Sequence, residues 1–190
     1  MLSSSPVIIQ ELIMQRIGLI FGTDTGNTEE VAQKLQERID WAIVETHDIA
    51  SCSVEDIQQY PVLILGIPTW DFGGIQADWE DFWPILEDMS FQDKIIALYG
   101  LGDQFGYGNY FLDAMGLLHD AVRDRGATII GHFSVEGFDF EESKALTEDG
   151  ESFVGLALDE DQQFELSDER IDRWLKQIHA ELDNLQVLSA

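Results

Sequence analysis

The sequence has little cysteine and few basic residues, and both shortages limit what the protein can be. Cys52 is the only cysteine among 190 residues, so an internal disulfide and a cysteine-based metal cluster are excluded. This usage suits a reducing compartment, and we expect a cytoplasmic protein. Only 10 Lys and Arg stand against 37 Asp and Glu, a formal net charge of -27, which argues against nucleic acid and anionic membranes as partners.

The few basic residues are also unevenly distributed along the chain. None occurs between residues 39 and 93, a span that holds twelve Asp and Glu. One broad face should therefore be strongly negative, and we expect a partner protein with a basic docking face. The alternative is that the acidic residues only keep the protein soluble.

Long apolar runs are missing as well, because no segment is long and apolar enough to cross a membrane. Gln10 and Glu11 interrupt the apolar start of the chain, so we expect no secretory signal there. We interpret residues 1–14 as an N-terminal extension that is disordered or precedes the native start. The apolar fraction of 45% supplies one core, and residues 15–187 are expected to form a single domain.

Apolar runs of strand length alternate with helical periodicity. Strands are expected at 16–22, 42–47, 61–67, 94–100 and 128–133, and helices at 28–38, 53–59, 76–89, 109–125 and 168–186. This alternation predicts an α/β fold, a doubly wound parallel sheet with helices on both faces. Ser53 is expected to cap the second helix. The acidic segment 134–152 precedes a new apolar run at 153–158, so an inserted loop is expected to split the last strand.

The first expected strand runs into a turn that is rich in hydroxyl groups. The chain has seven threonines, and three of them, Thr23, Thr25 and Thr28, lie within six positions at the start of the first helix. Backbone N–H groups at a helix start, hydroxyl donors and the helix dipole together favour an anion such as a phosphate. No Lys or Arg lies in this turn, so the anion site is expected to work with neutral donors alone.

Two further loops follow strands whose carboxyl ends should meet at the same edge of the sheet, where such folds bind ligands. Trp70 lies in the segment 68–74, where it can stack on a ligand, although large aromatic side chains are more often packed into the core. Residues 100–109 contain four glycines, which allow the backbone to approach a ligand closely. In that loop Asp103 offers a hydrogen-bond acceptor and Tyr107 a second stacking side chain.

Together the three loops suit a flat, phosphorylated, redox-active ring. The Gly-x-Gly of the third loop lacks the spacing of a dinucleotide fingerprint after the first strand, so a nicotinamide site is not supported. The sequence shows no Ser-His-Asp motif, no acid–base pair beside the loops and no paired His at metal spacing. The acidic run 159–161 does not form a calcium loop, because Phe164 stands where that loop needs glycine. We therefore expect no metal site.

Five segments carry a specific family resemblance: FGTDTGNTEEVA at 21–32, PTWDFG at 68–73, GLGDQFGY at 100–107, EGFDF at 136–140 and FVGLALDE at 153–160. On these segments the chain, from residue 14 to about 185, resembles the long-chain flavodoxins, and most closely the flavodoxin B type of proteobacteria. The resemblance implies a five-stranded parallel sheet, in the order 2-1-3-4-5, that holds one non-covalent FMN. It also implies a monomeric, low-potential one-electron carrier without a substrate of its own, which works with redox proteins such as a flavodoxin reductase.

The resemblance gives each loop a role toward FMN. Residues that would hold the phosphate are Thr23, Asp24, Thr25, Gly26, Asn27 and Thr28. Trp70 and Tyr107 would sandwich the isoalloxazine ring, Asp103 would accept from its N3–H, and the Asp71–Phe72 peptide would meet N5. Further expected contacts are Pro68, Thr69, Gly73, Leu101, Gly102, Gln104 and Asp161. Gly74 departs from the family pattern, which often has an acidic residue there.

Two other functions stay open. A flavin-dependent quinone reductase-like enzyme would need a substrate pocket over the ring, which Trp70 and Tyr107 would cover. A phospho-receiver or FMN-free binding module of the same architecture would need clustered acidic residues at the end of the first strand, where Gly22 and Thr23 stand.

Overall fold

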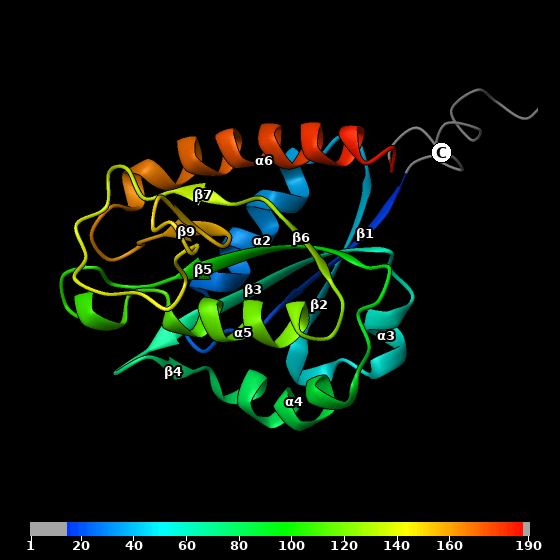
Figure 1. The fold of residues 1–190 in the computed structure, drawn as a ribbon, viewed down its shortest axis with the longest axis horizontal. Helices are drawn as coiled ribbons and strands as arrows, with labels where there is room; N and C mark the ends of the chain where they lie inside the picture. The colour runs from blue at the N-terminus through cyan, green and yellow to red at the C-terminus, as the bar shows by residue number, and fades with distance from the viewer. Residues whose placement is uncertain (1–14, 188–190) are drawn as a thin grey trace, which may run out of the picture.

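Runs of buried apolar residues form a parallel sheet at the centre of the molecule (Figure 1). The computed structural model describes residues 15–187, so the expected extension at residues 1–14 lies outside the described part. The strands of the sheet are β1 (Arg16–Phe21), β2 (Ile43–Asp48), β3 (Val62–Trp70), β5 (Ile95–Leu101), β6 (Thr128–Ile130) and β9 (Leu156–Leu158). A two-residue strand, β4 (Gly74–Ile75), turns back along the end of β3.

The strands are ordered β2-β1-β3-β5-β6, and all of these pairs are parallel. This order confirms the expected 2-1-3-4-5 topology, because β4 is only an antiparallel extension of β3. The chain reverses its direction of winding between β2 and β3. Adjacent crossovers therefore leave a gap beyond the carboxyl ends of β1 and β3, where a ligand can bind.

The fifth position of the sheet is shared by two strands. β6 pairs with the first half of β5, and β9 pairs with the second half. Residues 131–155, here called the insertion, leave the sheet between them and form an antiparallel pair, β7 (Phe133–Ser134) with β8 (Ser152–Phe153). The prediction that an inserted loop splits the last strand is thus confirmed.

Helices cover both faces of the sheet, as predicted. In Figure 1, α2 (Asn27–Arg38) and α6 (Ser167–Asn184) lie on one face, and α4 (Ala77–Asp88) and α5 (Asp113–Arg123) lie on the other. A short helix, α3 (Val54–Gln58), begins after the predicted cap Ser53, whose hydroxyl accepts from the backbone N–H of Asp56 at 3.1 Å. Three 3-10 turns complete the elements: Ile49–Ser51, Gly108–Tyr110 and Phe164–Leu166. None of the helices described between residues 15 and 187 is both long and apolar enough to span a membrane.

Three predicted boundaries were wrong by three residues or more. β3, expected to end at residue 67, continues to Trp70, because its last two residues pair with β4. The strand expected at 128–133 ends at Ile130, because Gly131 adopts a positive φ of 80° and its carbonyl accepts from Trp174 Nε1 at 2.7 Å. The helix expected from residue 109 begins at Asp113, after the 3-10 turn and Leu112 with a φ of 61°. All three changes depend on strand pairing, side-chain contacts or backbone angles that hydrophobic periodicity does not contain.

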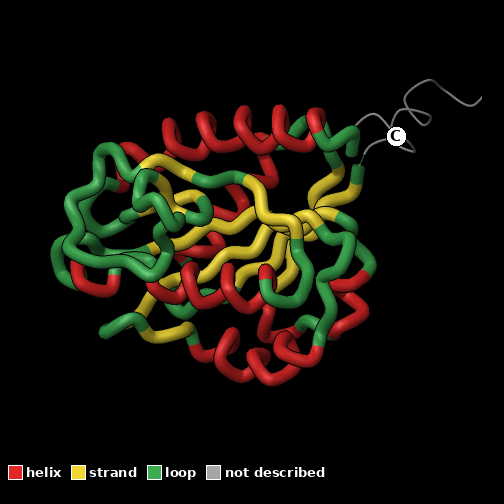
Figure 2. The backbone as a smooth tube through the Cα atoms, viewed as in Figure 1, coloured by secondary structure: helices red, strands yellow, loops and turns green. Residues whose placement is uncertain are grey.

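The insertion is anchored by its own aromatic cluster. The rings in mutual contact are Phe111, Phe133, Phe138, Phe140 and Phe153, with centroids 5.2 to 6.4 Å apart. Phe111 belongs to the segment before α5, so the cluster ties the insertion to the loop after β5. As Figure 2 shows, the longest loops gather beyond one end of the strands.

Candidate functional site

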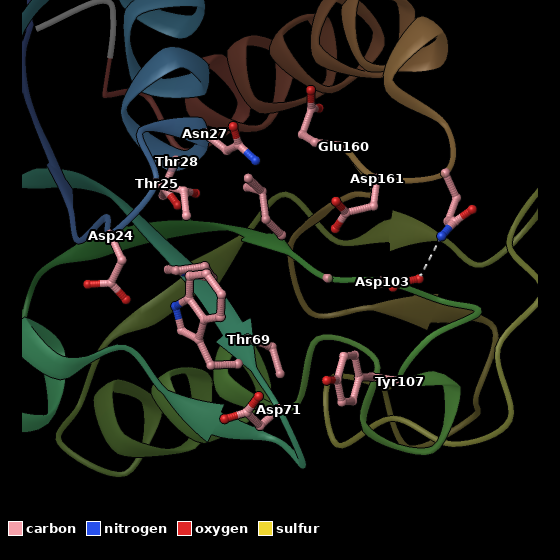
Figure 3. Close-up of a pocket in the computed structure, with 15 residues that line it drawn as sticks. Asp24, Thr25, Asn27, Thr28, Thr69, Asp71, Asp103, Tyr107, Glu160 and Asp161 are labelled. Atoms are coloured by element: carbon pink, nitrogen blue, oxygen red, sulfur yellow. Dashed lines mark hydrogen bonds between the residues drawn. The ribbon is translucent and has the colours of Figure 1, made fainter.

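A cavity of about 480 Å³ lies beyond the carboxyl ends of β1, β3 and β5 (Figure 3). Its lining residues come from the three predicted loops and from the segment after β9. They are Asp24, Thr25, Asn27, Thr28, Pro68, Thr69, Trp70, Asp71, Leu101, Gly102, Asp103, Tyr107, Glu160, Asp161 and Gln162. Thirteen of the eighteen predicted site residues are in this set, so the sequence motifs located the cavity.

The first loop presents the start of α2 to the cavity. Gly26 precedes the helix with a φ of 92°, it has no side chain to cap the helix, and a Cβ added there would meet nothing within 4 Å. The N–H groups of a helix's first turn have no partner within the helix. Thr25, Asn27 and Thr28 line the cavity around them. The corner is therefore suited to an anion that caps α2.

Buried side chains from other elements hold this loop in place. Tyr99, fully buried on β5, donates its hydroxyl to the Thr28 carbonyl at 2.9 Å. Gln76, also fully buried, donates from Nε2 to Asp24 Oδ1 at 3.0 Å. The Gln76 Oε1 accepts from the backbone N–H of Trp79 at 3.2 Å, so the same residue caps α4. The start of α2 is thus fixed from both sides of the loop.

The second loop brings Trp70 to the cavity. Trp70 is half-buried and lines the cavity, so it does not fill the core. Its indole N–H is buried and has no hydrogen-bond partner among the described residues. The loop then turns sharply, with Asp71 at a φ of 46° and Gly73 at 87°. Phe72, at the tip, is 77% exposed.

The third loop is organised around Asp103. Its Oδ1 accepts from the backbone N–H groups of Phe105 and Gly106, at 3.0 and 2.8 Å. Gln162 adds a bond from Nε2 to the same oxygen at 3.2 Å (Figure 3). Tyr107 lines the cavity and remains 40% exposed. The other carboxylate oxygen, Oδ2, has no hydrogen bond within the described residues and lies beside Gly106, where an added Cβ would overlap it.

The segment after β9 supplies the fourth wall, and most of it was missed by the sequence reasoning. Glu160 and Gln162 line the cavity beside the predicted Asp161. The available signal was topological: β9 pairs with β5, so its carboxyl end reaches the edge that carries Asp103. Burial, reinforced by the charges of Asp103 and Asp159, raises the pKa of the Asp161 carboxyl.

Five predicted site residues do not line the cavity: Thr23, Gly26, Phe72, Gly73 and Gln104. Thr23 Oγ1 accepts from the backbone N–H of Gly26 at 3.0 Å, which closes the turn. The Gln104 side chain is buried and bonds Asp159 instead. These residues shape the loops from behind or stand at their tips.

All charged residues of the cavity wall are acidic: Asp24, Asp71, Asp103, Glu160 and Asp161. Within residues 15–187, no Lys or Arg lines this cavity. The expected neutral anion site is therefore embedded in a negative field. Such a field opposes any further negative charge on a bound molecule.

Comparisons with known proteins agree with this geometry. Flavodoxin 1 of Salmonella typhimurium is 49% identical to the chain over 173 residues, which cover 91% of the chain and 98% of that protein. A flavodoxin of Klebsiella pneumoniae is 48% identical over 177 residues, 93% of the chain and 100% of that protein. The crystal structure of Fusobacterium nucleatum flavodoxin bound to flavin mononucleotide superposes with a TM-score of 0.82 at 32% identity, covering 88% of the chain and 99% of that structure.

The flavodoxin family itself matches residues 19–174, a range that contains all three loops and the segment after β9. The relatives are matched over nearly their whole length. The order of the strands, and the position of the cavity at their carboxyl ends, agree with the family resemblance of the sequence motifs. The chain belongs to the flavodoxin family.

Proposed function

We propose that the protein binds one FMN non-covalently in the cavity at the sheet edge and carries single electrons between redox proteins. It is an electron-transfer protein rather than an enzyme. The observation that carries the proposal is the cavity itself, with an uncapped helix start in one wall and Trp70 and Tyr107 in others. Nothing in the comparisons favours a quinone reductase.

The chemistry of the cavity fits FMN. Its volume of about 480 Å³ lies in the usual range for a site that buries a small organic cofactor. The start of α2 offers backbone N–H groups and threonine hydroxyls to a phosphate. Trp70 and Tyr107 offer aromatic faces to a flat ring, and the free Oδ2 of Asp103 offers an acceptor to a ring N–H. Donors, acceptors and aromatic groups are thus each available for one part of FMN.

Each group of residues then has one task. Thr25, Asn27 and Thr28, which line the cavity at the start of α2, would hold the phosphate, and the turn from Thr23 to Gly26 would keep them in place. Trp70 and Tyr107 would pack against the ring and exclude water from it, and Asp103 would orient the ring by accepting a hydrogen bond. Thr69, Gly102 and the Asp71–Phe72 peptide complete the contacts. Bound FMN supplies the one-electron redox chemistry, while the protein supplies orientation and electrostatics.

The acidic wall should lower the reduction potential of a bound cofactor. Five carboxylates face the cavity, and no basic side chain of the described residues is there to offset them. A negative field raises the energy of an anion, so it disfavours adding the last electron. We infer that the protein works at low potential.

The net negative charge of the protein favours a particular class of partner. An acidic protein of net charge -27 is steered toward partners with basic docking faces, such as a flavodoxin reductase and low-potential electron acceptors. We further propose a long-chain type, on the insertion, and a monomer whose single domain spans residues 15–187. The single cysteine supports a cytoplasmic location.

Reconstitution with FMN tests the proposal. Titration of FMN with apoprotein should quench the flavin fluorescence at one equivalent, and a spectroelectrochemical titration should resolve two one-electron steps. Trp70→Ala and Tyr107→Ala should each weaken FMN binding by about tenfold to hundredfold, since stacking on an aromatic side chain contributes about 1–3 kcal/mol per ring.

Trp41→Ala is the matched control for these variants. Trp41 stacks on His179, with ring centroids 4.7 Å apart, and is not part of the cavity wall. Its removal should leave FMN affinity unchanged. Equal affinity in both cavity variants would remove the aromatic contacts from the proposal, and sustained turnover of NAD(P)H and a quinone by the pure protein would overturn the carrier function.

A further inference from the structure

Gln104 occupies an unusual position in the third loop. In the described segment from Gly102 to Tyr107 it is the one buried side chain, with 2% exposure, whereas Phe105 is 61% exposed. Asp103 precedes it and Tyr107 follows, and both line the cavity. Gln104 is thus the side chain that points inward between two residues of the cavity wall.

Every polar group of Gln104 that points inward has a partner. Its backbone N–H and its Nε2 both donate to Asp159 Oδ2, at 3.0 and 2.9 Å. Its Oε1 accepts from the backbone N–H of Asp139, in the insertion, at 2.6 Å. The side chain here must donate at one end, to a carboxylate, and accept at the other, from the backbone, as an amide does.

Asp159 completes the connection on the other side. It is fully buried, and its Oδ1 accepts from the backbone N–H groups of Asp161 and Gln162, at 3.2 and 2.9 Å. One carboxylate thus ties the third loop to the segment after β9. Gln162 in turn donates to Asp103, so the bonds close a ring around one side of the cavity.

We infer that Gln104 and Asp159 are positioning residues, which hold Asp103 and Tyr107 in their binding arrangement through the bonds that join the third loop, the insertion and the segment after β9. The inference rests on the proposed function, since FMN is the ligand whose binding reports the arrangement. A loop held in place before binding loses less entropy when the ligand arrives. Disrupting the Gln104–Asp159 pair should therefore weaken FMN binding although neither side chain lines the cavity.

The variant Gln104→Glu probes the pair with a single-atom change. It keeps the acceptor that faces Asp139 and replaces the donor that faces Asp159 by an oxygen. When the new carboxyl is ionised, two carboxylates face each other in a buried place. When it is protonated, its O–H can donate to Asp159 and restore the bond. Burial and the charge of Asp159 both favour the protonated form, so the switch should occur above the pH at which an exposed glutamate titrates.

The charged surroundings of this position come from four elements. Asp103 belongs to the same loop, Asp139 to the insertion, and Asp161 to the segment after β9, where its own pKa is raised. From α6, Arg170 is 5% exposed and stacks on Phe138, and the charge of Asp159 acts on it. Because these groups are common to all variants, the comparison is made as a ratio to the wild-type affinity at each pH.

The experiment measures the dissociation constant of FMN by fluorescence quenching at pH 8 and pH 6. At pH 8, Gln104→Glu should bind FMN at least roughly tenfold more weakly than the wild type, as expected for one lost buried hydrogen bond and the repulsion that replaces it. At pH 6 the ratio should fall to within roughly threefold. The near-UV circular dichroism of the bound flavin should change at pH 8 and recover at pH 6.

Gln92→Glu is the matched control. It adds the same charge at an exposed position just before β5, at the opposite end of the sheet, and its ratio should stay near one at both pH values. Asp159→Asn is the second variant, which carries the test should Gln104→Glu fail to fold by far-UV circular dichroism. The asparagine side chain has the shape of aspartate but directs an NH2 group at N–H donors. Because this group does not titrate, the loss of FMN affinity should be equal at pH 8 and pH 6.

The outcomes separate the two proposals. Absence of FMN binding by the wild type would refute the proposed function. Wild-type binding with an unchanged affinity in Gln104→Glu at pH 8, or with a loss that is the same at both pH values, would refute the positioning role. Unchanged affinity in Asp159→Asn would refute it as well.

Discussion

Removing one hydroxyl group, in Tyr99→Phe, tests whether the centre of the sheet fixes the start of α2. The Tyr99 ring is fully buried, and its hydroxyl reaches the Thr28 carbonyl at 2.9 Å. Burial raises the pKa of Tyr99 well above its ordinary value, so the hydroxyl remains a neutral donor wherever the protein is folded. Gly66 makes room for the ring, because a Cβ there would overlap the end of the tyrosine.

The expected cost follows from what the change leaves behind. A neutral intramolecular hydrogen bond contributes about 0.5–1.5 kcal/mol net. Thr28 lies at the second position of α2, so its carbonyl keeps the helical partner four residues later and is not left unsatisfied. The phenylalanine ring fills the same space. We therefore expect a loss of about 1 kcal/mol in the free energy of unfolding, without the added penalty of an orphaned polar group.

Urea unfolding of the apoprotein, followed by far-UV circular dichroism at 25 °C, measures this loss. With a slope of about 2 kcal/mol/M, the midpoint should fall by about 0.5 M and the slope should not change. Tyr110→Phe is the control, because Tyr110 is half-buried and its hydroxyl has no hydrogen bond within the described residues. A midpoint equal to the wild type in Tyr99→Phe, or a fall of the same size in the control, would refute the reasoning.

Three other predictions concern packing, titration and docking. Gly116→Ala should lower the melting temperature, although alanine in a helix is favoured by about 1 kcal/mol, because its Cβ would collide with the Lys144 carbonyl of the insertion. A higher melting temperature would contradict that packing. Folding raises the pKa of Asp161, so the free energy of unfolding of the wild type falls as the pH rises from the unfolded pKa through the folded one. Asp161→Asn should therefore be more stable in urea than the wild type at pH 7 and equally stable at pH 2.5. Electron transfer to a basic partner should slow as ionic strength rises, and a rate independent of salt would exclude charge steering.

Most of the fold could be predicted because its signals are local. Alternating apolar runs and helical periodicity located the strands and helices, and the predicted cap Ser53 makes the expected bonds. One of the strand errors lies where a distant group decides the backbone. The end of β6 depends on Trp174 of α6, forty-three residues away in sequence. Strand length alone therefore extended β6 too far.

The cavity could be predicted where its walls carry local motifs, and it could not be predicted where distant strand pairing forms the wall. Its three main loops each carry a local motif, whereas Glu160 and Gln162 enter the wall only because β9 pairs with β5. Gln104 lies inside a predicted motif, and yet its side chain turns away from the cavity toward Asp159. A motif shows that a loop is present; it does not show which of its side chains face the ligand.

Glutamine amides hold the carboxylates around the cavity, and this choice of donor has a consequence for function. The pairs are Gln76 with Asp24 at 3.0 Å, Gln104 with Asp159 at 2.9 Å and Gln162 with Asp103 at 3.2 Å. A lysine or arginine would satisfy the same oxygens and bind them more strongly, but it would cancel their charge. An amide fixes the orientation of a carboxylate and leaves its negative charge in place. The loops are thereby ordered without weakening the negative field of the cavity, and the α2 start likewise offers only neutral donors to an anion.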